Sequence, residues 1–189
     1  MKHIPNILTI LRLLLVPCFL WASMRGMYVA AFVIFLSAAV TDILDGMIAR
    51  RLNVHSRLGA LLDPAADKTL MVSAFLYYTF AAKLPVVEVP AWLTFTIFIR
   101  DFMIGVFAYL MYTRVQITRF PPTIAGKAST VLQATTVAVV IGANAFAPAA
   151  AGVAWLLFRA VLFMTLFSAW GYMRRAAFLL RDEGAAARS

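Results

Sequence analysis

Cysteine and histidine are nearly missing from this sequence. Its 189 residues include one cysteine, Cys18, inside an apolar run, and two histidines, His3 and His55. A disulfide framework needs pairs of cysteines, and a zinc site built from His and Cys needs more ligands than these in one place. The sequence therefore excludes both a disulfide scaffold and a His/Cys zinc centre.

Charge is scarce as well. Charged residues make up 13% of the chain, whereas 63% is hydrophobic and the mean hydropathy is +0.89. A soluble domain is nearer half apolar, so the excess predicts a surface covered by lipid. Six apolar runs are long enough to cross roughly 30 Å of hydrocarbon, and we take the first as a retained helix, not a removed signal peptide. They lie at about 7–24, 28–49, 60–82, 90–112, 125–147 and 152–173.

Short connections between these runs predict an all-α integral membrane protein. We expect six transmembrane helices in one bundle, which forms a single domain over residues 1–189. The tail after Arg181, ending in GAAARS, is expected to be disordered.

Basic residues gather on one side of the predicted spans. Thirteen would share a side with the N-terminus, and only Arg25 and Lys83 would lie opposite. This bias places both termini in the cytoplasm, most simply in a bacterial inner membrane. The net charge of +9 is then a topology signal that also attracts anionic lipid, and we expect no nucleic-acid partner. The thirteen are Lys2, Arg12, Arg50, Arg51, Arg57, Lys68, Arg114, Arg119, Lys127, Arg174, Arg175, Arg181 and Arg188.

Acidic residues number only eight, yet five lie in or at the edges of spans. Each costs at least ~2.5 kcal/mol at mid-membrane, so each requires a partner. Asp42 and Asp45 are three residues apart at the cytoplasmic end of the second span. Asp63 and Asp67 are four apart at the start of the third, so each pair shares a helix face. The short loop between the two helices is expected to bring the pairs opposite each other. The fifth acid is Asp101.

Four converging carboxylates would repel one another and take up protons unless cations neutralise them. An oxygen-only cluster suits Mg²⁺, Mn²⁺ or Ca²⁺ better than zinc. Two such ions a few ångströms apart would clamp the bridging oxygens of a diphosphate. We therefore predict two divalent cations, Mg²⁺ or Mn²⁺, at this rim; an ion pair or helix cap would explain one isolated Asp but not four.

Small and basic residues lie between the two carboxylate pairs. Gly46, Ala49 and Gly59 would let a planar base and its phosphates approach the backbone, although small residues also serve helix packing. Arg50 and Arg57 lie where a diphosphate needs cationic donors, although loop arginines are common on the cytoplasmic side.

Residues 42–67 read D-I-L-D-G-M-I-A-R, eight spacer residues, then G-A-L-L-D-P-A-A-D. This pattern resembles the motif of the CDP-alcohol phosphotransferase family, D-x-x-D-G-x-x-A-R, eight spacers, G-x-x-x-D-x-x-x-D. Weaker similarity covers most of the chain. It includes Pro5-Asn6, Thr9 and Arg12 as P-N-x-x-T-x-x-R, Lys68 in D-P-x-A-D-K, and Gly126-Lys127, Thr130 and Gln133 as G-K-x-x-T-x-x-Q.

The resemblance implies a six-helix membrane enzyme, usually a homodimer, that binds CDP-diacylglycerol and two divalent metals at its cytoplasmic side. An acceptor hydroxyl would attack the lipid-bearing phosphorus and expel CMP. Asp67 is our predicted general base, within reach of that hydroxyl. By position, Asp42, Asp45 and Asp63 would be metal ligands, Asp67 would bind metal or act as the base, and Gly46, Ala49, Arg50 and Gly59 would line the cytidine diphosphate site.

The acceptor remains open between two alternatives. Arg114, Arg119 and Lys127 cluster at the predicted cytoplasmic mouth, which favours glycerol 3-phosphate and hence a phosphatidylglycerophosphate synthase. Ser129 replaces the second lysine of the G-K-x-K-T segment usual in such synthases, and no second arginine follows Arg100 one or two turns on. Arg100-Asp101 and the stretch 121–123 resemble the family's cardiolipin synthases instead, whose acceptor is phosphatidylglycerol. Inositol phosphate, serine or another alcohol are further alternatives.

Two interpretations concern charges deeper in the membrane. We expect Asp101 to pair with Arg159, which would satisfy both charges. A cation or proton-coupled transporter is the rival class, since intramembrane carboxylates also mark ion paths. It would spread acids along a crossing route and often show inverted repeats, whereas four of the five acids here crowd at one rim.

Overall fold

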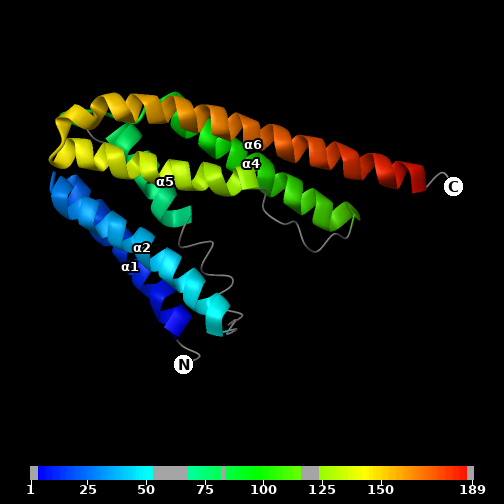
Figure 1. Cartoon of the computed structure of the whole chain (residues 1–189), viewed down its shortest axis with the longest axis horizontal. Helices are drawn as coiled ribbons and strands as arrows, with labels where there is room; N and C mark the ends of the chain where they lie inside the picture. The colour runs from blue at the N-terminus through cyan, green and yellow to red at the C-terminus, as the bar shows by residue number, and fades with distance from the viewer. Residues whose placement is uncertain (1–3, 53–67, 82–83, 116–123, 187–189) are drawn as a thin grey trace. The chain divides into compact units, whose positions relative to one another are not determined.

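The computed structural model describes the backbone of residues 4–52, 68–81, 84–115 and 124–186. It describes the side chains of residues 11–41, 68–80, 84–107, 109, 113 and 124–174. Within these ranges every regular element is helical, which confirms the predicted all-α class (Figure 1).

Six helical segments follow the six predicted apolar runs. The third is helical over 68–76 and continues as the π-helix η1, and the predicted start of this run, 60–67, lies outside the described residues. The labelled elements, in chain order, are α1 (Ile4–Met24), α2 (Tyr28–Leu52), η1 (Tyr77–Ala81), α4 (Ala91–Val115), α5 (Ile124–Ala145), η2 (Pro148–Ala150) and α6 (Ala151–Ala186).

Two helical stretches in the described chain are long and apolar enough to cross a membrane, Ile124–Ala145 and Pro148–Arg174. Shorter apolar helices lie at Leu11–Met24 and Tyr28–Thr41. Large apolar side chains are exposed, such as Phe102 at 74% and Phe163 at 71%, and contiguous exposed apolar surface marks contact with lipid or another protein. The number of spans and their orientation stay predictions.

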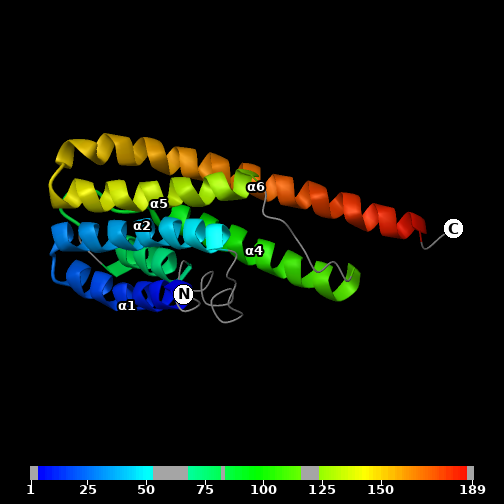
Figure 2. The ribbon, with the colours of Figure 1, turned by 60° about the horizontal axis from the view of Figure 1, so that its bottom comes forward.

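The chain divides into two compact units, and the first comprises residues 1–89 and 134–154. Here α1 and α2 run side by side and are joined by a tight turn (Figures 1 and 2). Gly26 takes a φ of +69° just after α1. The Met27 N–H donates to Ala22 O and the Gly26 N–H to Ser23 O, which is the Schellman arrangement that a glycine at this position permits. The Arg25-Gly26 break in the sequence is therefore a true helix end.

The core of the first unit is aromatic at the end near this turn. Phe19 is fully buried, with its ring centroid 5.8 Å from that of Phe35 and 6.2 Å from that of Tyr78. The hydroxyl of Tyr77 donates to Ser23 O at 2.6 Å, and the Tyr78 hydroxyl lies 3.2 Å from Ser23 Oγ. The π-helical turn at η1 thus directs two consecutive tyrosines to the end of α1.

Asn144 holds the segment before α4 against the end of α5. Its Oδ1 accepts from the backbone N–H groups of Val86 at 3.0 Å and Val87 at 3.4 Å. Its Nδ2 donates to Val87 O at 2.9 Å and to Val140 O in its own helix at 2.8 Å. One buried side chain therefore satisfies backbone groups of a connection that has no regular structure of its own.

The second unit comprises residues 90–133 and 155–189 and contains α4, the first part of α5 and most of α6. Its apolar core includes Leu93 and Ile97 of α4 and Phe158 and Val161 of α6. With 36 residues α6 is about 54 Å long, more than a membrane span needs. It continues to Ala186, past Arg181 where we expected the tail to begin. Good helix formers such as Leu179, Leu180 and Arg181 extend the preceding helix.

Candidate active site

The first half of the sequence motif lies on an unbroken helix. The backbone of α2 is helical through Leu52, so Asp42, Asp45, Gly46 and Ala49 follow one another at i, i+3, i+4 and i+7. These positions form one stripe along a helix. Arg50 follows at i+8 and belongs to the same stripe. The backbone positions of both predicted carboxylates, both small residues and the arginine therefore share one face of the helix.

The hydroxyl just before this stripe is occupied within its own helix. Thr41 Oγ1 donates to Ser37 O at 2.9 Å and to Ala38 O at 2.8 Å. Such back-bonding is common for threonine in apolar helices and takes the hydroxyl donor away from other roles. The predicted site on α2 thus starts at Asp42.

The second half of the motif cannot be placed. Gly59, Asp63 and Asp67 lie outside the described residues, as do Arg57 and Arg119, and the side chains of the α2 stripe and of Arg114 are not described either. Among the described side chains there is no group of three His, Cys, Asp or Glu residues that could hold a metal ion, and the side chains of all four predicted ligands are not among those described. The convergence of the carboxylates stays a prediction.

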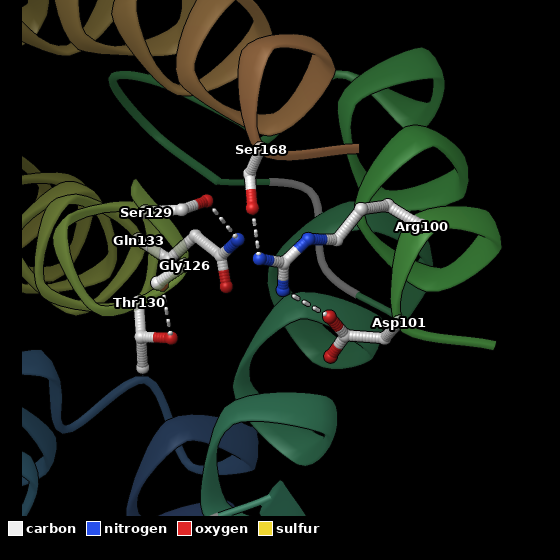
Figure 3. A network of polar contacts seen from close by, with 7 residues as sticks. All are labelled: Arg100, Asp101, Gly126, Ser129, Thr130, Gln133 and Ser168. Atoms are coloured by element: carbon white, nitrogen blue, oxygen red, sulfur yellow. Dashed lines mark hydrogen bonds and ion pairs between the residues drawn. The ribbon is translucent and has the colours of Figure 1, made fainter. Parts of the chain in front are cut away.

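A polar cluster inside the second unit centres on Arg100 (Figure 3). Arg100 lies in α4 and is only 8% exposed. Its Nη1 donates to Asp101 Oδ1 at 2.8 Å, and its Nη2 donates to Ser168 Oγ of α6 at 2.6 Å. The guanidinium is thus held from two sides, and one of its three nitrogens, Nε, has no hydrogen-bond partner among the described residues.

The α5 side of this cluster is uncharged. Gln133 Nε2 donates to Ser129 Oγ at 3.2 Å, and both residues are buried. The Gln133 amide points toward the Arg100 guanidinium (Figure 3). We call Arg100, Asp101, Ser129, Gln133 and Ser168 the Arg100 cluster. One turn before Ser168 on α6, the hydroxyl of Thr165 is fully buried and has no partner in the described part of the chain.

Sequence reasoning missed Ser168 and Thr165 and gave Gln133 no role beyond the resemblance. A serine and a threonine three residues apart in an apolar helix share one face, but hydroxyls are common in membrane helices. That spacing was the only signal available.

The predicted pair of Asp101 with Arg159 is wrong. Asp101 pairs with its neighbour Arg100, whereas Arg159 is exposed on α6. Arg159 precedes Ser168 by nine residues, which at about 100° per residue places it on the opposite side of the helix. The face of α6 that meets Arg100 therefore turns Arg159 away from it.

Lys127 is the one predicted acceptor-binding residue whose side chain is described. It lies near the start of α5 and is exposed. Six residues separate it from Gln133, about 9 Å along the helix. Close by, Thr130 Oγ1 donates to Gly126 O at 3.2 Å. The Gly126-Lys127 segment is thus an ordinary first turn with a free-standing cation on its surface.

Comparison with known proteins gives a coherent result. Residues 2–171 match the model of the family described as CDP-alcohol phosphatidyltransferase. The chain is 32% identical over 188 residues to a probable phosphatidylglycerophosphate synthase of Mycobacterium tuberculosis, covering 96% of this chain and 84% of that protein. It is 37% identical over 131 residues to a putative cardiolipin synthase of the same organism, covering 67% of this chain and 58% of that protein.

A third relative is the CDP-diacylglycerol–glycerol-3-phosphate 3-phosphatidyltransferase of Aquifex aeolicus, 41% identical over 81 residues, which are 43% of this chain and 46% of that protein. The chain therefore spans less than two thirds of the putative cardiolipin synthase and most of the probable phosphatidylglycerophosphate synthase.

Proposed function

This chain belongs to the CDP-alcohol phosphatidyltransferase family, and from that premise we propose that it transfers the phosphatidyl group of CDP-diacylglycerol to glycerol 3-phosphate. The products are phosphatidylglycerophosphate and CMP, and the reaction belongs to phospholipid biosynthesis. The observation that carries the proposal is the complete carboxylate motif at 42–67 within a family match from residue 2 to 171.

The transfer exchanges one phosphorus–oxygen bond for another. A hydroxyl oxygen of glycerol 3-phosphate attacks the phosphorus that carries the diacylglycerol, and the bond from that phosphorus to the oxygen shared with CMP breaks. The proton of the hydroxyl passes to a carboxylate, for which Asp67 is our candidate, and CMP leaves with the bonding electrons.

The donor set fits two divalent cations. Asp42, Asp45, Asp63 and Asp67 offer only oxygen ligands, and the first two share one face of the continuous helix α2. When bound, Mg²⁺ or Mn²⁺ would supply neutralisation of the diphosphate charge. Gly46, Ala49, Arg50 and Gly59 would hold the cytidine diphosphate, because the small residues on the α2 stripe leave room beside the backbone.

The acceptor side would use cations outside the motif. Lys127, Arg114 and Arg119 would meet the phosphate of glycerol 3-phosphate at the membrane edge. We infer that the Arg100 cluster also serves the acceptor, since its spare Nε and neighbouring hydroxyls are the groups that bind a phosphate and an alcohol. An unpaired donor on a buried cation is costly unless a ligand completes it.

A second candidate acceptor is phosphatidylglycerol, which would make the protein a cardiolipin synthase. Two observations favour it. The α5 side of the Arg100 cluster is neutral, with Ser129 bonded to Gln133 in place of a second cation. Identity to the putative cardiolipin synthase, at 37%, also exceeds the 32% to the probable phosphatidylglycerophosphate synthase, although over a shorter stretch.

The setting is proposed from the same premise. We place the protein in a membrane with six spans, both termini and the active site at the cytoplasmic face, and two copies in a homodimer. The apolar helices and their exposed apolar side chains support the membrane setting.

An acceptor panel tests the function. Purified protein is incubated with CDP-diacylglycerol, Mg²⁺ or Mn²⁺, and one of glycerol 3-phosphate, phosphatidylglycerol, inositol phosphate, inositol or serine, and lipid products are identified by mass. We expect CMP release with glycerol 3-phosphate that needs metal and is lost in Asp42→Asn. Glu88→Gln, which changes an exposed carboxylate outside the motif, is the matched control. Absence of CMP release with every acceptor would overturn the proposal, and metal-dependent ion flux instead would favour a transporter.

A further inference from the structure

A single cation interrupts an apolar stripe on the outer face of α6. Arg159 is exposed, and its neighbours one turn away on the same face are Leu156, 66% exposed, and Phe163, 71% exposed. Trp155, 51% exposed, precedes Arg159 by four residues. These positions are spaced so that they lie along one side of the helix.

Arg159 has no internal partner in the described chain. The salt bridge found among the described side chains joins Arg100 to Asp101 and does not involve Arg159. It also lies about half a turn around α6 from Ser168, the residue that faces α4. A charge that faces hydrocarbon needs a counter-charge, and the described side chains supply none to Arg159.

The position of Arg159 along α6 indicates where a counter-charge would lie. It follows Ala151, the first residue of α6, by eight residues, about 12 Å along the helix. Side chains of a helix lean toward its N-terminus, and an arginine extends its charged end toward the membrane surface. The guanidinium is therefore directed to the leaflet that contains the α5–α6 turn.

We propose that Arg159, with Trp155, Leu156 and Phe163, binds the phosphate of an anionic phospholipid in that leaflet. The guanidinium fork matches two phosphate oxygens, and the three apolar side chains flank the acyl chains. An anionic lipid is favoured over a zwitterionic one because its net charge of one is neutralised by a single arginine. This site lies on the face of α6 away from the Arg100 cluster. The lipid-binding proposal requires that α6 lies in a bilayer, but it does not depend on the proposed transfer reaction.

Native mass spectrometry of the purified full chain tests the site. The protein in detergent is titrated with phosphatidylserine, with phosphatidylcholine or with inorganic phosphate, for wild type, Arg159→Gln, Arg159→Lys and Arg174→Gln. We expect Arg159→Gln to weaken the tightest phosphatidylserine binding about tenfold, a typical contribution of a charge-assisted bidentate contact, and Arg159→Lys to weaken it less. Arg174→Gln, which removes another exposed cation of α6, should leave it unchanged.

Four results would overturn the proposal. Equal phosphatidylserine binding by wild type and Arg159→Gln would remove Arg159 from the site. Equal binding of phosphatidylcholine, or competition by inorganic phosphate at the same concentration, would remove the anionic lipid as ligand. Loss of a dimer in Arg159→Gln would assign the arginine to a contact between copies. Because Arg159→Gln only replaces a charge on an exposed apolar face, a thermal melt is expected to show a folded protein.

Discussion

Two buried polar clusters, one in each unit, differ in how completely their hydrogen bonds are satisfied among the described residues. In the first unit Asn144 makes four hydrogen bonds to backbone groups. Tyr77 donates to the backbone carbonyl of Ser23, and the hydroxyl groups of Tyr78 and Ser23 share a hydrogen bond. In the second unit Arg100 keeps a spare Nε among the described residues. Completed polar networks hold a fold together, whereas incomplete ones leave capacity for a ligand. The difference suggests that the first set is structural and the second serves binding.

The largest effect should come from Asn144→Ala. It removes four hydrogen bonds and leaves the buried N–H of Val87 without its acceptor, so we expect a loss of about 2–4 kcal/mol of stability. The measurement is unfolding in mixed detergent micelles. Activity per folded molecule should stay within about twofold of wild type. A selective loss of acceptor affinity would contradict a purely structural role for Asn144.

Arg100→Lys should have the opposite effect to Asn144→Ala, because it should lower activity and leave stability nearly unchanged. Lysine keeps the charge beside Asp101 but lacks the planar fork that reaches Ser168 and a ligand together. We expect kcat/KM for the acceptor to fall roughly 10- to 100-fold, with the melting temperature nearly unchanged. Kinetics over a range of acceptor concentrations measure it. Wild-type kinetics with a large drop in melting temperature would make Arg100 structural.

Gly26→Ala isolates backbone conformation in the first unit. A Cβ at this position meets nothing within 4 Å, so the cost is the positive φ of +69° alone. We expect a destabilisation of about 1–2 kcal/mol without change in kinetics. A neutral result in the same unfolding assay would show that the turn relaxes out of the left-handed conformation.

Two serine substitutions make the sharpest matched pair, with the smallest effects. Ser168→Ala removes the hydroxyl that accepts from Arg100, and Ser23→Ala removes the one beside Tyr78. Each loss is worth about 1 kcal/mol. The first should raise the acceptor KM about fivefold, and the second should lower stability only. Identical stability losses with an unchanged acceptor KM in both variants would remove the distinction between the two clusters.

Sequence reasoning succeeded where one local feature decides the outcome. Gly26 ends α1 because only glycine takes a positive φ freely. The apolar runs form helices because in hydrocarbon the backbone N–H and C=O groups must form their hydrogen bonds within the chain. The spacing of Asp42, Asp45 and Gly46 along one face follows from helical periodicity once α2 is known to continue through Leu52.

It failed where the answer depends on how helices are rotated against each other. Arg159 was assigned to Asp101 because both are charged and both lie in spans, yet the rotation of α6 that brings Ser168 to Arg100 turns Arg159 outward. Ser168 gave only a weak signal, its spacing of three residues from Thr165, since a serine in an apolar helix is equally suited to packing. The approach of Asp63 and Asp67 to the α2 stripe remains a prediction.

The measurement closest to the central claim compares wild type with Asp67→Asn in two assays on the same preparation. One is binding of CDP-diacylglycerol and the other is metal-dependent release of CMP with the best acceptor. We expect the variant to bind CDP-diacylglycerol normally and to release CMP at least about 100-fold more slowly, the usual contribution of a general base. Near-normal turnover in Asp67→Asn would contradict the assignment of the carboxylate motif as the catalytic centre.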